Sequence, residues 1–185
     1  MSTSPQAVNF LAHWIDVCKQ RHDILFGDWP RSSFFTAHVF TAPNCIIDDI
    51  AARMGLRSYC GYYSIDAVLF ADDDLVPDRP VGTTWFRRIR IAFEHENDFY
   101  SGLFQEVSHL LITDCDLRVV VSYPGNHDDF DSELEYLHRI IAGTDRSAQI
   151  AATGAFLFIA GWRHVEYGTI EWWGYVYEHK HWRRL

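Results

Sequence analysis

Apolar and polar residues alternate from residue 88 to residue 96, which is the pattern of a half-buried strand. Ile89, Ile91 and Phe93 occupy one set of alternate positions. The other set carries Arg88, Arg90, Ala92, Glu94 and Glu96. Because alternate side chains leave a strand on the same face, Glu94 and Glu96 are predicted to lie on one face, close enough to share a cation.

The residues after this strand predict a helix, for which Asn97 or Asp98 can provide the N-cap. Its apolar stripe consists of Phe99, Leu103, Val107, Leu110 and Leu111. Residues 117–125 then predict a strand that is buried on both faces, and residues 62–70 upstream predict a strand that carries Asp66. A strand, a helix and a further strand in succession indicate a parallel, right-handed crossover.

Shorter elements are predicted in the rest of the chain. Helical spacing covers residues 6–26, whereas residues 34–40 favour a short extended segment. Asn44 can cap a helix over Cys45–Met54, which ends at Gly55.

The acidic stretch 71–84 predicts an exposed loop. Asp131 or Ser132 can cap a helix over 133–142, and two strands are predicted over 154–162 and 166–182.

Together these elements predict one α/β domain over residues 1–185, with a mixed β-sheet flanked by helices. A hydrophobic content of 48% and an aromatic content of 16% argue against a disordered chain. No apolar run reaches the length of a membrane span and no leader sequence is recognisable, so we expect a cytoplasmic protein with no membrane segment. The scattered cysteines are expected to be reduced; they are Cys18, Cys45, Cys60 and Cys115.

The formal charge of −9 disfavours a protein that coats nucleic acid non-specifically, because phosphate binding requires clustered cations. It remains compatible with a nuclease, whose metal-binding acids add negative charge locally. Nearly all the basic residues are arginines, and Arg88 and Arg90 are candidates for phosphate binding. Ordinary surface ion pairs are the alternative role for these arginines.

Three acids have the chemistry of a divalent-cation site: Asp66, Glu94 and Glu96. Mg²⁺ takes hard oxygen ligands and keeps several waters, so one to three carboxylates suffice. Such a cation can bind a phosphodiester oxygen and lower the pKa of a water molecule. This role requires Asp66 to lie beside Glu94 in the sheet, and the alternative is that the glutamates are solvated at a strand end.

The order of these strands, acids and helix resembles the PD-(D/E)xK nuclease superfamily, which has the restriction-endonuclease-like fold, over residues 45–125. In that family an Asp lies on one core strand and an acid-x-Lys signature on the next. Asp66 and Glu94 match the two acids, and Glu96 stands at the position of the usual Lys. A further acid is common on the preceding helix, where Asp49 (or its neighbour Asp48) is the match.

The resemblance implies a nuclease that acts on DNA with Mg²⁺ (or Mn²⁺). Asp66 and Glu94 would hold the metal, and Glu96 would assist it or act as a general base. The missing Lys leaves a second interpretation open, a non-catalytic binding or regulatory protein with the nuclease fold.

The predicted helix after Glu96 adds two weaker candidates. Glu106 and His109 stand three residues apart, so they share a helix face and could contact substrate or simply pair with each other. His95 is expected to face away from the glutamates, as a packed core histidine.

Two further segments each have competing interpretations. Residues 124–129, PGNHDD, resemble one signature of calcineurin-like metallophosphoesterases, but the other signatures of that family are absent, which favours a loop with an Asn-led turn. The aromatic residues of the C-terminal segment fit either base stacking or a sheet core with a homodimer interface; they are Trp162, Trp172, Trp173, Tyr175, Tyr177 and Trp182.

Overall fold

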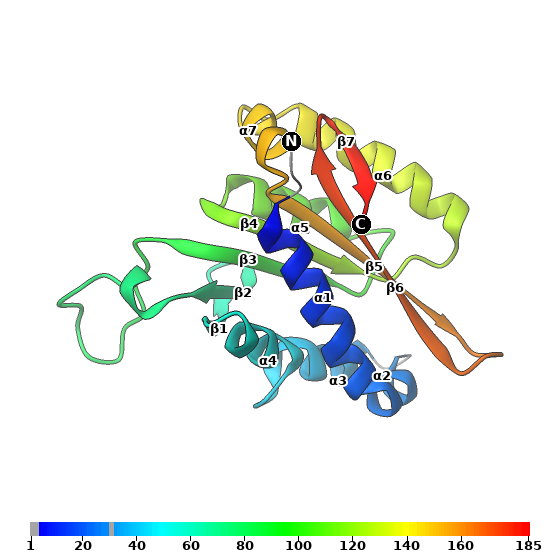
Figure 1. The fold of residues 1–185 in the computed structure, drawn as a ribbon, viewed down its shortest axis with the longest axis horizontal. Coiled ribbons are helices and arrows are strands. Elements are labelled where there is room, and N and C mark those ends of the chain that lie inside the picture. The colour runs from blue at the N-terminus through cyan, green and yellow to red at the C-terminus, as the bar shows by residue number, and fades with distance from the viewer. Residues whose placement is uncertain (1–3, 30–31) are drawn as a thin grey trace.

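The computed structural model describes residues 4–29 and 32–185, whose fold is shown in Figure 1. The helical elements are α1 (Pro5–Gln20), α2 (His22–Asp28), α3 (Ser32–Thr36), the π-helix η1 (Ala37–Thr41), α4 (Ile46–Arg53), the 3₁₀-helix η2 (Asp72–Asp74), α5 (Leu103–Ile112), α6 (His127–Ala142) and α7 (Ser147–Thr153). The strands are β1 (Arg57–Tyr62), β2 (Ile65–Phe70), β3 (Ile89–Glu96), β4 (Cys115–Ser122), β5 (Phe156–His164), β6 (Thr169–Glu178) and β7 (His181–Arg184).

These strands form one sheet whose spatial order follows the chain from β1 to β7. β4 is parallel to both of its neighbours, β3 and β5, whereas the other neighbouring strands pair antiparallel. Helix α5 connects β3 to β4, and α6 and α7 connect β4 to β5. The predicted mixed sheet flanked by helices is therefore confirmed, as is the parallel strand–helix–strand unit.

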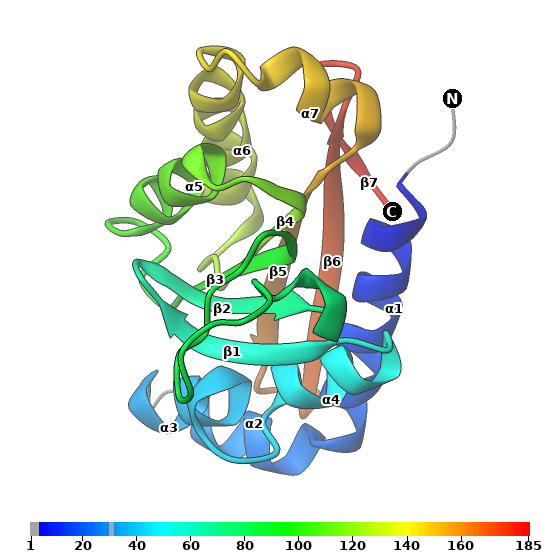
Figure 2. The same cartoon turned by 90° about the vertical axis from the view of Figure 1, so that its left-hand side faces the viewer.

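Helices cover both faces of the sheet, as Figure 2 shows. α1 and α4 lie on one face, where Trp14 packs against Phe93 of β3 in a shared apolar core. α5, α6 and α7 lie on the other face, where Phe130 stacks on Phe158 of β5. The central parallel strands are thus buried on both sides, which explains the near-continuous apolar composition of β4. None of the described helices combines the length and apolar character that a membrane crossing would need.

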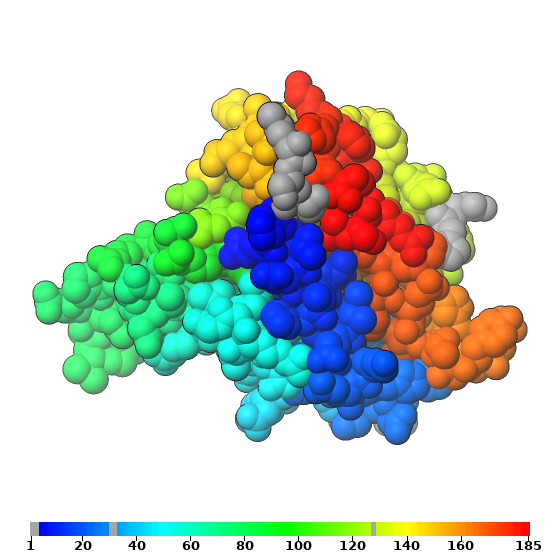
Figure 3. Space-filling model, in the orientation of Figure 1, coloured from blue at the N-terminus to red at the C-terminus, as the bar shows by residue number. Residues whose placement is uncertain are grey.

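Two segments project from this layered body in Figure 3: the connection between β2 and β3 and the tip of the β5–β6 hairpin. The first contains the predicted exposed loop 71–84, in which Val81 is fully exposed. A bridge between Leu75 and Phe86 and a buried carboxylate, Asp74, fix the base of this loop. The cysteines form no disulfide.

Residues 34–40 are helical, so the predicted extended segment there is wrong. They belong to α3 and η1, and Phe35 and Val39 are buried with the core of the α1 layer. Their aromatic and β-branched composition suits a strand locally, but the packing of Phe35 against His95 and Tyr123, and of η1 against α4, overrides that preference.

Helix boundaries differ from the predicted caps. α4 does end before Gly55, whose φ of 69° is the left-handed value that terminates helices. Its N-cap, however, is Cys45 rather than Asn44. α5 begins at Leu103, several residues after the predicted caps, because residues 97–102 form a turn of their own.

The predicted final strand over 166–182 is wrong in its extent, because the chain turns and forms a second strand, β7. His179 and Lys180 make the turn with φ values of 52° and 63°. Trp162 and Tyr177 are buried inside the protein, and the Trp182 indole N–H donates to the Leu134 carbonyl at 3.0 Å. The aromatic residues of this segment thus contribute to the core of the sheet.

Candidate functional site

Asp66 and Glu94 lie side by side at the point where β2 and β3 come together. Their strands pair through Ala67 and Phe93, which places Asp66 opposite Glu94 one step further along. The Asp66 backbone N–H donates to Oε2 of Glu94 at 3.1 Å, and the backbone N–H of His95 donates to Oδ2 of Asp66 at 2.8 Å. The two residues are therefore adjacent, as predicted, but Asp66 does not belong to the group of side chains whose ligand atoms lie close enough to hold one ion.

The Glu94 side chain is only 1% exposed. Its Oε1 atom has no hydrogen-bond partner among the described residues. Burial is the main cause of a strong upward shift in the pKa of Glu94, and the negative charges of Asp66 and Glu106 add to it. Burial likewise raises the pKa of Asp66. Burying an ionised carboxylate is costly unless its charge is compensated, so the raised pKa favours the protonated form of Glu94 when no cation is bound.

Helix α5 presents Glu106 and His109 to the buried Glu94 carboxylate. Nδ1 of His109 lies 3.8 Å from Oε1 of Glu94 and 3.4 Å from Oε2 of Glu106. One ligand atom from each of the three residues lies within 4.8 Å of the others, which is close enough for all three to hold one metal ion. The two weaker candidates are therefore brought to the site, and the signal for them was their three-residue spacing on the helix after the glutamates.

Glu96 lies at the end of β3 but engages the beginning of α5. Its Oε1 accepts a hydrogen bond from the Asp98 backbone N–H at 2.6 Å. Its carboxylate also fills the space beside Gly102, where an added Cβ would come within 2.1 Å of Oε2. Burial raises the pKa of Glu96, and the bond from Asp98 partly offsets this rise. Glu96 thus holds the turn that leads into α5, next to the group formed by Glu94, Glu106 and His109.

His95 faces the opposite side of the sheet, as predicted for a core histidine. It is buried, stacks on Phe35 and is hydrogen-bonded through Nε2 to the Tyr123 hydroxyl. Burial lowers the pKa of His95 to about 3, so its ring is neutral at physiological pH.

Asp49 does not lie near the group formed by Glu94, Glu106 and His109. It lies on α4, in the layer that covers the other face of the sheet, and it pairs with Arg21. Its neighbour Asp48 accepts a hydrogen bond from the Ser58 hydroxyl at 2.5 Å. Both aspartates therefore have structural partners away from Glu94.

Arg88 lies just before β3 and Arg90 lies near its beginning, whereas the glutamates lie at its end. At about 3.3 Å per residue, four residues of strand separate Arg90 from Glu94 by about 13 Å. Arg88 pairs with Asp116 at 2.8 Å, and Arg90 pairs with the buried Asp74 at 2.7 Å. The ion pairs that formed the alternative interpretation are thus present, and a phosphate-binding role stays a prediction.

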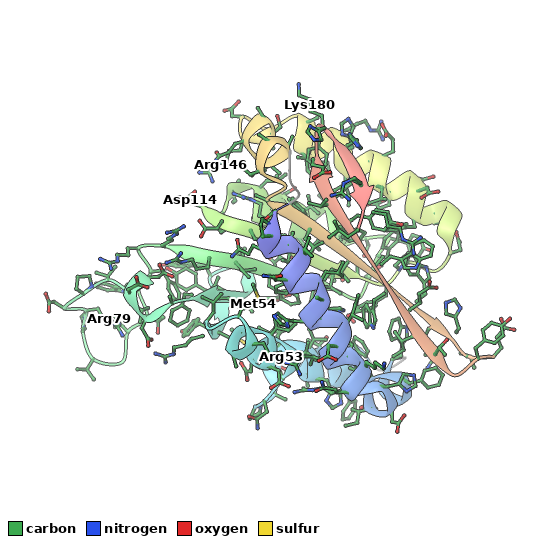
Figure 4. All side chains as sticks on the ribbon, in the orientation of Figure 1. Arg53, Met54, Arg79, Asp114, Arg146 and Lys180 are labelled. Carbon is green, nitrogen blue, oxygen red and sulfur yellow. The ribbon has the colours of Figure 1, made fainter. Side chains whose placement is uncertain are left out.

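A groove of about 610 Å³ lies at this same end of the strands. Its lining includes Arg88, Arg146 and Asp114, of which the last two form an ion pair at 3.2 Å. Figure 4 shows Arg146 and Asp114 near each other, and Arg79 far out on the β2–β3 connection. The groove has mixed charge and is separate from the carboxylates at the end of β3.

Comparisons with models of protein families, with curated protein sequences and with solved structures give no significant match to this chain.

Proposed function

We infer that the protein is a metal-dependent phosphodiesterase that cleaves DNA, with Asp66 and Glu94 as its central carboxylates. The observation that carries this inference is the buried pair of carboxylates on adjacent strands, faced by Glu106 and His109 from α5. Oxygen ligands at this position suit Mg²⁺ or Mn²⁺. The bound cation would polarise a phosphodiester oxygen and lower the pKa of the attacking water.

Different residues would bind the cation and position the residues that bind it. Glu94 and Asp66 would bind and orient the cation, and the backbone N–H of His95 would keep the Asp66 carboxylate turned toward Glu94. Glu96 would keep α5, with Glu106 and His109, in place beside the pair.

The succession of elements supports the nuclease resemblance. A helix, three antiparallel strands, a helix and a parallel strand follow one another from α4 to β4. This is the setting in which the resembling nucleases carry an Asp on one strand and the second acid on the next. DNA as the substrate rests on that resemblance.

A non-catalytic binding protein of the same fold is the second candidate. Glu96 replaces the usual Lys, and its carboxylate is engaged by the turn into α5. Arg88 and Arg90 are also engaged by aspartates. Both observations favour a protein that lacks part of the catalytic group.

A metallophosphoesterase centred on residues 124–129 has less support. Oδ1 of Asn126 accepts a hydrogen bond from the Asp129 backbone N–H at 2.8 Å, and its amide donates to the Asp129 carboxylate at 2.7 Å, so this side chain caps α6. The side chain of His127 lies outside the described residues. Substituting His127 would abolish activity if this centre were used and would leave the nuclease nearly unchanged.

Cleavage of supercoiled plasmid in the presence of Mg²⁺ or Mn²⁺ tests the proposal. Wild type should nick the plasmid only with a divalent cation, and Glu94→Ala or the isosteric Glu94→Gln should lower the rate by at least a hundredfold. Glu135→Gln, an exposed change on α6, is the matched control and should keep full activity.

Metal-dependent nicking by both wild type and Glu94→Gln would remove Glu94 from the reaction. No nicking by wild type on plasmid, single-stranded DNA or a pool of random sequences would favour the binding protein instead.

A further inference from the structure

Three ligand atoms of two different kinds converge beside β3: carboxylate oxygens of Glu94 and Glu106 and the Nδ1 nitrogen of His109. Glu94 comes from the sheet, whereas Glu106 and His109 come from α5, so packing between two elements creates the group. The separations of 3.8 Å from His109 to Glu94 and 3.4 Å from His109 to Glu106 leave room for an ion between the atoms.

One oxygen of the Glu94 carboxylate, Oε1, points into this group without a hydrogen bond, whereas Oε2 accepts one from the Asp66 backbone N–H at 3.1 Å. Oε1 lies 3.8 Å from His109, a distance too long for a hydrogen bond, and it has no hydrogen-bond partner among the described residues. The neighbouring Glu106 carboxyl could satisfy it only by carrying a proton. Buried polar atoms are almost always satisfied in native proteins, and a bound ion is one recognised partner of an oxygen that lacks a protein donor. This unsatisfied oxygen is evidence for a bound ion. The evidence does not depend on how many acidic residues lie nearby.

Exposure increases from the core to the surface across the group. The Glu94 side chain is 1% exposed, that of Glu106 is 22% and that of His109 is 38%. An ion can therefore enter from solvent past His109, and water can complete its coordination on the open side.

We propose that Glu94, Glu106 and His109 bind a divalent transition-metal cation such as Mn²⁺, and that His109 makes the site prefer this class of cation to Mg²⁺. The inference rests on the proposed metal site, but it takes Glu106 and His109, rather than Asp66, as the ligands beside Glu94, and it narrows the identity of the ion. Mg²⁺ is bound mainly by carboxylates and water and gains little from imidazole, whereas first-row transition metals accept imidazole nitrogen readily. A mixed set of two carboxylates and one imidazole thus favours the transition metal.

A purely structural role for His109 makes a different prediction. Glu106 and His109 are three residues apart on one helix, and such a pair stabilises a helix by only about 0.2–0.5 kcal/mol. If His109 served only to pair with Glu106, replacing it would change the stability slightly and leave the affinity for every metal unchanged.

Isothermal titration calorimetry on protein freed of metal with EDTA, and then of EDTA, tests the proposal with Mn²⁺ and Mg²⁺ as probes. Wild type should bind Mn²⁺ at least tenfold more tightly than Mg²⁺. His109→Asn should lower the Mn²⁺ affinity at least tenfold and change the Mg²⁺ affinity less than threefold. Glu94→Gln should weaken the binding of both ions.

His181→Asn is the matched control, because His181 is exposed on β7 at the far edge of the sheet. It should leave both affinities unchanged. Circular dichroism confirms that each variant is folded, and Glu106→Gln, which should also weaken Mn²⁺ binding, replaces His109→Asn if that variant does not fold. Equal Mn²⁺ affinity in wild type and in His109→Asn (or in Glu106→Gln, where that variant is used instead) would overturn the proposal. Equal affinity of wild type for Mn²⁺ and Mg²⁺ would also overturn it.

The binding measurement separates this inference from the proposed function. A preference for Mn²⁺ that depends on His109, without DNA cleavage, would support the metal site and count against the nuclease. Cleavage that depends on Glu94 but proceeds equally with either ion and without His109 would support the nuclease and overturn the role of His109.

Discussion

At the scale of single residues, the protein holds buried carboxylates in two opposite electrostatic settings. Glu94 lies among other acids, and burial raises its pKa. Asp74 is equally buried, but Arg90 donates a hydrogen bond to it and holds its pKa below the usual value. A charge at Glu94 therefore opposes folding in the absence of metal, whereas a charge at Asp74 favours it.

Glu94→Gln is predicted to stabilise the metal-free protein. A folded-state pKa above the unfolded value of about 4.3 contributes stability that is complete below that value and is lost as the pH rises through the raised pKa. Asp66, Glu106 and His109 face Glu94 in both proteins, so the difference between them isolates Glu94.

We expect the variant to exceed wild type by on the order of 1 kcal/mol in free energy of unfolding at pH 8, and by much less at pH 5. Urea denaturation in EDTA at the two pH values measures this difference. A variant that is less stable than wild type at pH 8 would contradict the raised pKa of Glu94.

Asp74→Asn is predicted to have the opposite effect. Asp74 accepts hydrogen bonds from the Arg90 guanidinium at 2.7 Å and from the Ala71 backbone N–H at 2.8 Å, and losing the charge should cost about 2 kcal/mol of stability at pH 7. Because the pKa of Asp74 is lowered, its contribution is present above the unfolded pKa of about 3.9 and is lost as the pH falls through the folded value.

The difference between wild type and Asp74→Asn should therefore shrink in acid below about pH 4. Asp72→Asn is the control, since Asp72 pairs with Arg57 on the surface and its removal should cost less than about 1 kcal/mol. Equal effects of the two substitutions at pH 7 would show that burial of Asp74 is unimportant.

At the scale of elements, the position of α5 decides whether the carboxylates form a site. The alternation of β3 and the apolar stripe of α5 are both visible in the sequence, and Phe93 and Val107 are buried as predicted. The approach of His109 to Glu94 could not be predicted, because it depends on the turn over residues 97–102 and on the space left by Gly102. Sequence periodicity identifies which face of a helix is buried, but not the position along the neighbouring strand at which the helix packs.

Gly102→Ala tests how this turn positions α5. The new Cβ would come within 2.1 Å of Glu96 Oε2 and displace the carboxylate from the Asp98 N–H, at a cost of about 1 kcal/mol. In a Glu96→Ala background the carboxylate is already absent, so the same substitution should cost almost nothing. Denaturant unfolding of the four proteins gives the coupling energy, and additive effects would show that Glu96 and Gly102 act independently.

At the scale of the whole molecule, the sequence predicts the layers better than the connections. The α/β class and the central parallel strands follow from hydrophobic periodicity. The β6–β7 turn was missed because His179 and Lys180 adopt positive φ without the Asn-Gly signal that normally marks such a turn. The helical form of residues 34–40 was missed because packing, rather than local preference, determines it.

The shared sheet should make both helical layers unfold together. Phe93 packs with Phe10 and Trp14 on one face, and Phe158 packs with Phe130 on the other. Phe93 and Phe158 belong to the cores on opposite faces of the sheet, and both cores include residues of the same central strands. Truncating either side chain therefore removes contacts that these shared strands make.

Phe93→Ala and Phe158→Ala should therefore each cost about 3–5 kcal/mol and shift one common transition. Urea unfolding followed by far-UV circular dichroism and by tryptophan fluorescence tests this, and the two signals should give coincident midpoints in every variant. Tyr167→Ala, at a position 72% exposed on the β5–β6 turn, should stay within about 0.5 kcal/mol of wild type. Separate transitions, with only one moved by each substitution, would show that the two layers are independent folding units, and the site between β3 and α5 would then belong to the α5 layer alone.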